Sequence, residues 1–191
     1  IHIVLGSLSI ALLVYLISLF NKLVSKNNRV KTAWADIDVQ LKRRYDLVPN
    51  LVETVKGYKD YEASVLEKVT AARTTAIATK SGANLAAKIE AETAFSGALG
   101  NLFALAENYP QLKSSENFKQ LQSELTNLED NIQSARRYYN AAVREFNNAT
   151  QIFPSNMIAM AFSFQPGTFF GAEEAEKAPV NVSFQNDQTK K

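Results

Sequence analysis

The sequence predicts an all-α protein in which an N-terminal transmembrane helix continues into a long antiparallel up-down-up-down four-helix bundle. Three observations lead to this fold class. The first twenty residues are apolar and contain no Asp, Glu, Lys or Arg, and Gly and Pro are rare throughout. Residues 115–153 place apolar side chains at alternating steps of three and four, which is typical of a packed helix. We therefore divide the chain into a transmembrane helix (1–20), a bundle (21–153) and an apolar, membrane-proximal segment with an irregular tail (154–191).

Residues 1–20 have the length and composition of a membrane span. About 20 helical residues cross the ~30 Å hydrocarbon core of a bilayer. A signal peptide has a shorter apolar core and a small-residue cleavage site, and no such site follows Phe20. The alternative is a soluble core helix, which would need protein partners on all sides. The side chains that we expect in lipid are Leu5, Leu12, Leu13, Leu16 and Phe20.

Basic residues flank this span on one side only. Lys22, Lys26, Arg29 and Lys31 follow it, and no basic residue precedes it. The positive-inside rule then places the bundle in the cytoplasm and the N-terminus outside. We expect a single-pass protein of the plasma (inner) membrane with this orientation.

The helix expected over 22–57 keeps one apolar phase with the end of the span. Asn27 and Arg44 are the polar positions of its seam. Pro49 removes one backbone hydrogen bond and usually kinks a helix. Because a break would reset the phase and this phase is kept, we predict one continuous or gently kinked helix that extends the span. A break at Pro49 is the alternative.

Two shorter helices are expected over about 60–80 and 83–108, with small residues at their seams that allow close packing. The last helix, over 115–153, has Ser114 or Ser115 as its N-cap and Glu116 in its first turn, where the helix dipole favours an acid. Its stripe consists of Phe118, Leu121, Leu125, Leu128, Ile132, Ala135, Tyr139, Ala142, Phe146, Ala149 and Phe153. Since the first and last helices are similar in length, the chain should return near the level of Asn21.

The segment 157–170 is apolar and too short to span a bilayer. At membrane level it has two interpretations, a shallow interfacial anchor or a cap over the open end of the bundle. It lacks the Lys and Arg that a membrane-surface helix usually carries. The side chains concerned are Met157, Phe162, Phe164, Phe169 and Phe170.

The same geometry predicts ion pairs within the bundle. Arg44 lies in an apolar seam and needs a carboxylate, because an unpaired buried charge costs several kcal/mol. Glu129 or Asp130 is at the matching height on the last helix, and the first choice is Asp130. Asp38 should face Arg136 by the same count, with local pairing to Lys42 as the alternative.

Composition excludes several function classes. A net charge of +2 gives no broad footprint for nucleic acid. With no Cys and one His, the chain cannot assemble the usual zinc, haem or di-iron ligand sets. Neither a Gly-rich phosphate loop nor a G-x-S-x-G motif is present. We expect no enzyme activity, no cofactor and no bound metal.

Five motifs and the tail carry a specific resemblance. They are Ala33–Arg44 (AWADIDVQLKRR), Asp46–Val52 (DLVPNLV), Ala106–Pro110 (AENYP), Ala135–Asn140 (ARRYYN), Phe153–Asn156 (FPSN) and the tail residues Phe169, Phe170, Glu173, Glu174, Ala175 and Pro179. Over roughly 20–185 the chain resembles the LemA family. The resemblance implies a bacterial-type single-pass membrane protein with an antiparallel helical bundle and an outside N-terminus. It brings no catalytic residues, and a magnetosome-associated relative implies at most a link to membrane organisation.

Two functions fit these observations. The first is a membrane-anchored scaffold without catalysis, self-associating as a homo-oligomer, which organises the lipid bilayer or partner proteins. The alternative is an accessory subunit of a membrane protease, transporter or signalling complex. In that case the acidic segment 173–176 and the alternating Val180, Val182 and Phe184 would dock on a membrane-protein partner as an added strand.

Overall fold

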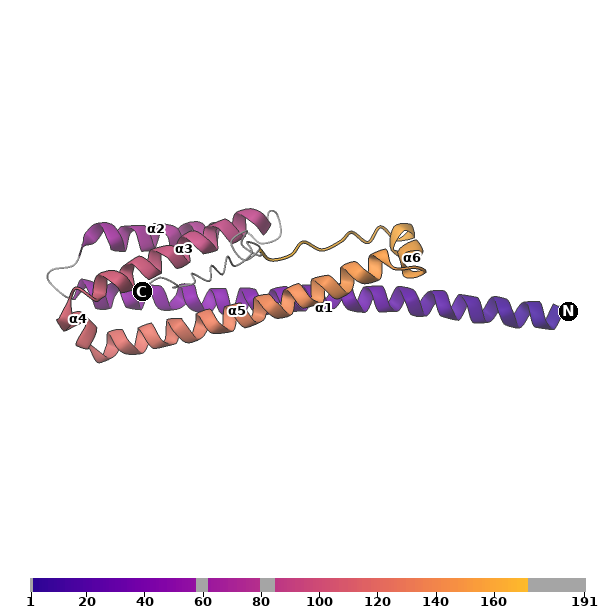
Figure 1. Cartoon of the computed structure of the whole chain (residues 1–191), viewed down its shortest axis with the longest axis horizontal. Coiled ribbons are helices and arrows are strands. Elements are labelled where there is room, and N and C mark those ends of the chain that lie inside the picture. Colours follow the sequence, from indigo (N-terminus) through magenta and orange to yellow (C-terminus); the bar gives the residue numbers. More distant parts are fainter. Residues whose placement is uncertain (1, 58–61, 80–84, 172–191) are drawn as a thin grey trace, which may run out of the picture.

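The computed structural model describes residues 2–57, 62–79 and 85–171, and within these ranges it is helical with no strand. The helices are α1 (His2–Lys56), α2 (Ala63–Ala78), α3 (Leu85–Ala106), α4 (Pro110–Ser114), α5 (Glu116–Gln151) and α6 (Ser155–Ala161). Figure 1 shows α1 as a long rod, with α5 along the part of it that is farther from the N-terminus and α2 and α3 over the end far from the N-terminus. The short helices α4 and α6 are additions to the four helices that the sequence predicts.

Helix α1 is uninterrupted from His2 to Lys56, a length of about 80 Å. The predicted span and the first helix after it are therefore one helix, as the unbroken apolar phase indicated. The helix passes through Pro49, which leaves the carbonyl of Tyr45 without its usual amide donor. Nε of Arg73 on α2 donates to that carbonyl at 2.7 Å. A side chain from a neighbouring helix thus replaces the bond that the proline removes.

Helices α1 and α5 run antiparallel in a constant register. Trp34 packs edge-on against Tyr139 with ring centroids 5.3 Å apart. Closer to the N-terminus of α1, Lys26 and Arg29 bind Glu145. In the other direction Arg44 reaches Glu129. This register brings the end of α5 back beside Phe20, as the similar helix lengths predicted.

The hydrophobic core follows the predicted stripe along α5 until its last position. Phe118, Ile132 and Phe146 are buried, whereas Phe153, which lies beyond the helix end, is 74% exposed. Ser115 caps α5 by accepting a hydrogen bond from the backbone N–H of Phe118 at 3.4 Å. The α2–α3 pair packs on the last part of α1, from Arg44 to Lys56, so the core is widest far from the N-terminus.

Candidate functional site

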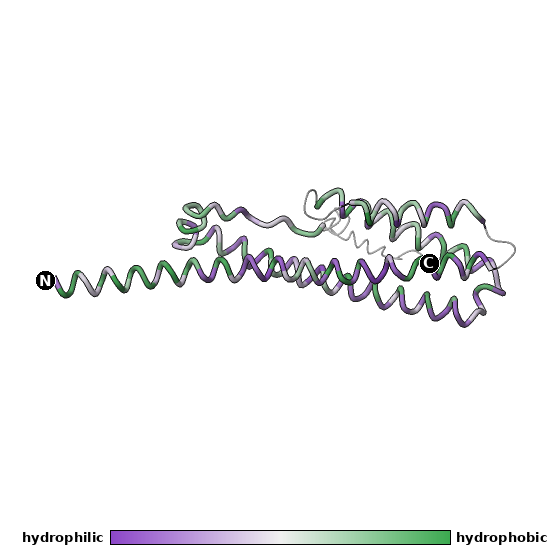
Figure 2. Tube along the Cα trace, turned by 180° about the vertical axis from the view of Figure 1, so that it is seen from behind, coloured by the Kyte–Doolittle hydropathy of each residue, from purple (hydrophilic) through white to green (hydrophobic). Residues whose placement is uncertain are grey.

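The N-terminal part of α1 extends beyond all other described helices. Its most apolar stretch is long enough to cross a membrane and has no residue buried inside the structure. Figure 2 shows this free part as a predominantly hydrophobic helix. The predicted lipid-facing residues Leu5, Leu12, Leu13 and Leu16 are all exposed there. A soluble core helix would be covered by protein, so this stretch has the surface of a membrane span and not of a core helix.

Phe20 lies where α1 meets the rest of the molecule. Its ring is 4.7 Å from that of Phe162 and 6.1 Å from that of Phe164. Phe164 also packs edge-on against Phe146 of α5. Three of the predicted membrane-anchoring aromatics therefore form one cluster that joins the base of the span to the end of α5.

Just beyond this cluster, Glu145 bridges the two long helices. Nζ of Lys26 and Nη1 of Arg29 lie 3.0 Å and 3.1 Å from Oε2 of Glu145. The hydrogen bond from Lys26 and the positive charges of Lys26 and Arg29 hold the pKa of the Glu145 carboxyl below its usual value. Two of the basic residues that set the predicted orientation thus also pair within the protein.

Residues 162–171 form an extended strap that runs from α6 back along the α1–α5 pair (Figure 1). The side-chain amide of Asn147 donates to the carbonyl of Gly167 at 2.9 Å and accepts from its N–H at 2.7 Å. One heptad earlier, Asn140 forms the same two-way pair with Phe170, at 3.0 Å and 2.8 Å. Two asparagines on α5 thereby hold the strap through its main chain.

The strap inserts Phe170 into the protein. Phe170 is 1% exposed, stacks on Trp34 at 5.6 Å and lies 4.5 Å from the guanidinium carbon of Arg136. The predicted lipid contact of Phe170 is therefore wrong. It and Phe169 lie near the level of Trp34, about 20 Å along α1 from Phe20. The prediction assumed that all of residues 157–170 stay level with Phe20, whereas the residues after α6 run along the α1–α5 pair toward Trp34.

The hydroxyl of Tyr139 supports the strap between its two asparagine pairs. It donates to the carbonyl of Thr168 at 2.8 Å, and burial raises the pKa of this hydroxyl. Sequence reasoning placed Tyr139 in the seam but missed the strap. The available signal was the spacing of Asn140 and Asn147, two polar residues one heptad apart beside an apolar stripe.

A buried ionic cluster joins α1, α3 and α5. Arg44 is 1% exposed and binds Glu92, which is fully buried, and Glu129 at 2.7 Å. Its Nη1 also donates to the hydroxyl of Ser96 at 2.9 Å. The guanidinium lies 5.0 Å from the centre of the Phe95 ring, so its face is covered as well.

Lys88 extends the cluster toward α2. Its Nζ lies 3.0 Å from Oε1 of Glu92, and it donates to the Tyr45 hydroxyl at 2.8 Å and to the carbonyl of Ala76 at 2.7 Å. Tyr45 in turn donates to Glu92. Burial and the hydrogen bond to Glu92 raise the pKa of the Tyr45 hydroxyl. Two cations and two carboxylates balance each other, which suits cross-linking of helices better than acid–base chemistry.

The predicted ion pairs have different outcomes. Arg44 contacts Glu129, one of the two carboxylates expected at its height, while Asp130 is exposed and is not its partner. Lys42, the alternative partner of Asp38, pairs with Asp46 at 2.6 Å. Arg136 lies over Phe170, and its pairing with Asp38 stays a prediction.

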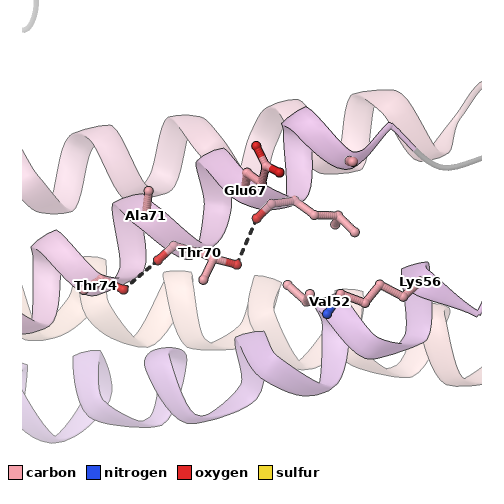
Figure 3. A pocket seen from close by; sticks show the side chains of 8 residues that line it. Val52, Lys56, Glu67, Thr70, Ala71 and Thr74 are labelled. Atoms are coloured by element: carbon pink, nitrogen blue, oxygen red, sulfur yellow. Dashed lines mark hydrogen bonds between the residues drawn. The ribbon is translucent and has the colours of Figure 1, made fainter.

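The hollow between α1 and α2 shows how polar side chains lie at the surface of the described residues. Its volume is about 510 Å³ (Figure 3), and it is lined by Val52 and Lys56 on one side and by Glu67, Thr70 and Thr74 on the other. The two threonine hydroxyls donate to carbonyls one turn earlier in α2 and do not converge on the hollow. Among the described residues no group of three His, Asp or Glu side chains is placed to hold a metal.

Comparison with known proteins agrees with the motifs. The model of the LemA family matches residues 33–184. Protein LemA of Metamycoplasma hominis is 27% identical over 163 residues, which cover 85% of this chain and 74% of that protein. Magnetosome protein MamQ of Magnetospirillum gryphiswaldense and Magnetosome protein MamQ 1 of Paramagnetospirillum magneticum are each 24% identical over 194 residues, covering 90% of this chain and 71% of theirs. The family match spans more than half of the chain and includes the ionic cluster, the strap and the motifs described above, so this protein belongs to the LemA family.

Proposed function

We propose that this chain is a non-catalytic scaffold, anchored in a membrane by one helix, which self-associates and holds membrane or partner proteins at a fixed distance. The observation that carries the proposal is the continuity of α1. The same helix is lipid-compatible at one end and, from Arg44 onward, cross-linked by buried charges at the other. A helix without a break transmits position from the bilayer to the far end of the molecule.

Further support comes from how the helices pack. We propose that α1, α2, α3 and α5 form the predicted up-down-up-down bundle, with the buried ionic cluster fixing their relative heights. Buried polar groups that are satisfied in one arrangement disfavour others, since slippage would leave them unpaired. A rigid rod of this kind suits spacing and assembly. The balanced charges of the ionic cluster favour this role over catalysis, and the threonine hydroxyls of the described hollow bind their own helix.

The positive flank of the span supports the expected orientation, with the bundle in the cytoplasm and the N-terminus outside. The names of the similar magnetosome proteins are compatible with a role in organising membrane. The acidic segment 173–176 and the alternating residues that follow it lie outside the described residues. The accessory-subunit alternative is therefore decided by crosslinking in native membranes.

The oligomeric state tests the scaffold directly. The full chain is reconstituted in lipid nanodiscs or mild detergent at increasing protein concentration, and its mass is measured. We expect multiples of the chain mass of 21.2 kDa. A single copy at every concentration would contradict self-association.

Crosslinking in native membranes separates scaffold from accessory subunit. The chain contains no cysteine, so one introduced cysteine reacts uniquely. Tyr138→Cys is suitable because Tyr138 is half-exposed on α5. Crosslinks between copies support the scaffold, whereas crosslinks to one other membrane protein alone would support the accessory-subunit alternative.

A further inference from the structure

A group of large apolar side chains remains exposed around α6. It comprises Ile152, Phe153, Met157, Met160 and Phe162, each between 58% and 74% exposed, and we call it the apolar collar. The members of the collar all lie within residues 152–162, around one short helix, whereas scattered exposed apolar residues are ordinary on protein surfaces. It therefore needs an explanation that the packing of the chain alone does not supply.

Helix α6 exposes large apolar side chains to solvent and buries a small one. It buries its small residue Ala159, which is 2% exposed, and turns Met157 and Met160 outward. A helix that packs on a soluble protein normally buries its large apolar side chains, because burial of apolar surface is the main gain. This arrangement is favourable only where the outer face of α6 meets an apolar phase.

The composition around α6 points to the same conclusion. No Asp, Glu, Lys or Arg occurs from Phe146 to Ala172. An exposed protein surface usually carries charges, and charged groups at a lipid interface are costly unless they reach the headgroups. A charge-free stretch that exposes methionine and phenylalanine fits an apolar environment better than water, and the basic residue that the segment itself lacks is present beside it as exposed Lys22 on α1.

The position of the collar indicates that lipid covers it. Helix α6 packs against both α5 and α1, and Phe162 contacts Phe20, the last residue of the apolar run. Figures 1 and 2 place α6 where α1 leaves the other helices, next to its free hydrophobic part. When α1 spans a bilayer, the collar lies at the level of the headgroups and the first acyl carbons. Exposed Lys22 is adjacent on α1, at the depth where basic residues meet phosphates.

We propose that the apolar collar is a second membrane contact, inserted into the lipid interface beside the emerging α1 helix. This proposal rests on the membrane anchoring in the proposed function and adds where and how the protein touches lipid a second time. Two contact points, one through the bilayer and one at its surface, hold the rod at a defined tilt, whereas a single span leaves its tilt free.

Lipid quenching of an introduced tryptophan tests the contact. The full chain carrying Met160→Trp is reconstituted in phosphatidylcholine vesicles with and without brominated acyl chains. We expect the added fluorescence to be strongly quenched by the brominated lipid. The native Trp34 lies about 20 Å along α1 from Phe20, away from the collar, and provides an unquenched background. If Met160→Trp does not reach the helix content of the parent chain, Met157→Trp replaces it.

Tyr138→Trp is the matched control, because Tyr138 is also an exposed large side chain but lies at the level of Trp34. It should show no quenching. If the collar tryptophan were quenched no more than this control while the chain still floats with the vesicles, the inference would be wrong and the anchoring would stand. Failure of the chain to float would instead contradict the anchoring itself. Met160→Cys chains that crosslink to each other, with the collar tryptophan unquenched, would assign the surface to a second copy.

Discussion

Arg73 and Pro49 should be energetically coupled, although they lie on different helices. Pro49 cannot donate to the carbonyl of Tyr45, and Nε of Arg73 donates to that carbonyl instead, at 2.7 Å. Replacing Arg73 by Met keeps the apolar stem and removes the donor. A hydrogen bond from a charged group contributes about 1.5–3 kcal/mol, and a partly buried carbonyl left unpaired costs about 1–3 kcal/mol. We therefore expect Arg73→Met to lower the free energy of unfolding by about 1–3 kcal/mol.

Pro49→Ala changes this result in a specific way. Alanine restores an N–H that donates to the Tyr45 carbonyl within α1, so that carbonyl no longer depends on Arg73. In the Pro49→Ala background we expect Arg73→Met to cost less than about 1 kcal/mol. The coupling energy of the double-mutant cycle should then be about 1–2 kcal/mol, well above the ~0.5 kcal/mol scatter of independent sites.

The assay is urea unfolding of the full chain in mild detergent, followed by circular dichroism and by the emission of Trp34. Arg137→Met is the matched control, because Arg137 is exposed on α5 and donates to Ser134 on its own helix. It should change stability by less than about 0.5 kcal/mol. Equal costs of Arg73→Met with and without Pro49 would refute the replacement of the missing backbone bond.

Three further predictions concern the buried groups. Arg44→Met removes the cation that joins Glu92 to Glu129, while Lys88 still pairs with Glu92, so it should destabilise the protein by about 3 kcal/mol, measured by thermal unfolding. Phe170→Ala empties the site on Trp34 and should cost about 3–5 kcal/mol and shift the Trp34 emission to longer wavelength; unchanged emission would show that the strap does not cover it. Because the pKa of the Tyr45 hydroxyl is raised in the folded protein, the unfolded chain loses the hydroxyl proton at lower pH than the folded protein does. The free energy of unfolding should therefore fall as the pH rises above the ordinary tyrosine pKa of 10.0. Tyr45→Phe should remove part of that fall.

The long helices followed from the sequence because their apolar residues are periodic. The heptad stripe of α5 fixed its face, and the similar lengths of the outer helices placed Glu129 at the height of Arg44. Glu92 lies near the seam of α3, but its pairing with Lys88 was not predicted, because small and apolar residues define that seam. Their spacing of four, on the same helix face, was the signal for a buried pair.

The strap could not be found by the same reasoning. It is held by side-chain amides that bind its main chain, and such contacts leave no apolar period in the strap itself. The segment was therefore assigned to the membrane level as a whole. In the structure only its first part, around Phe162, stays there, and Phe170 is buried far from it.

The way in which the strap is bound also bears on how this region tolerates mutation. Asn140 and Asn147 recognise peptide groups, which every non-proline residue offers, so the outward side chains of Gln165 and Thr168 carry little of the binding. Natural variation should therefore accumulate at these outward positions, while the two asparagines and Phe170 stay constrained. A genetic screen of this segment would yield a sparse pattern of intolerant sites within an otherwise permissive stretch.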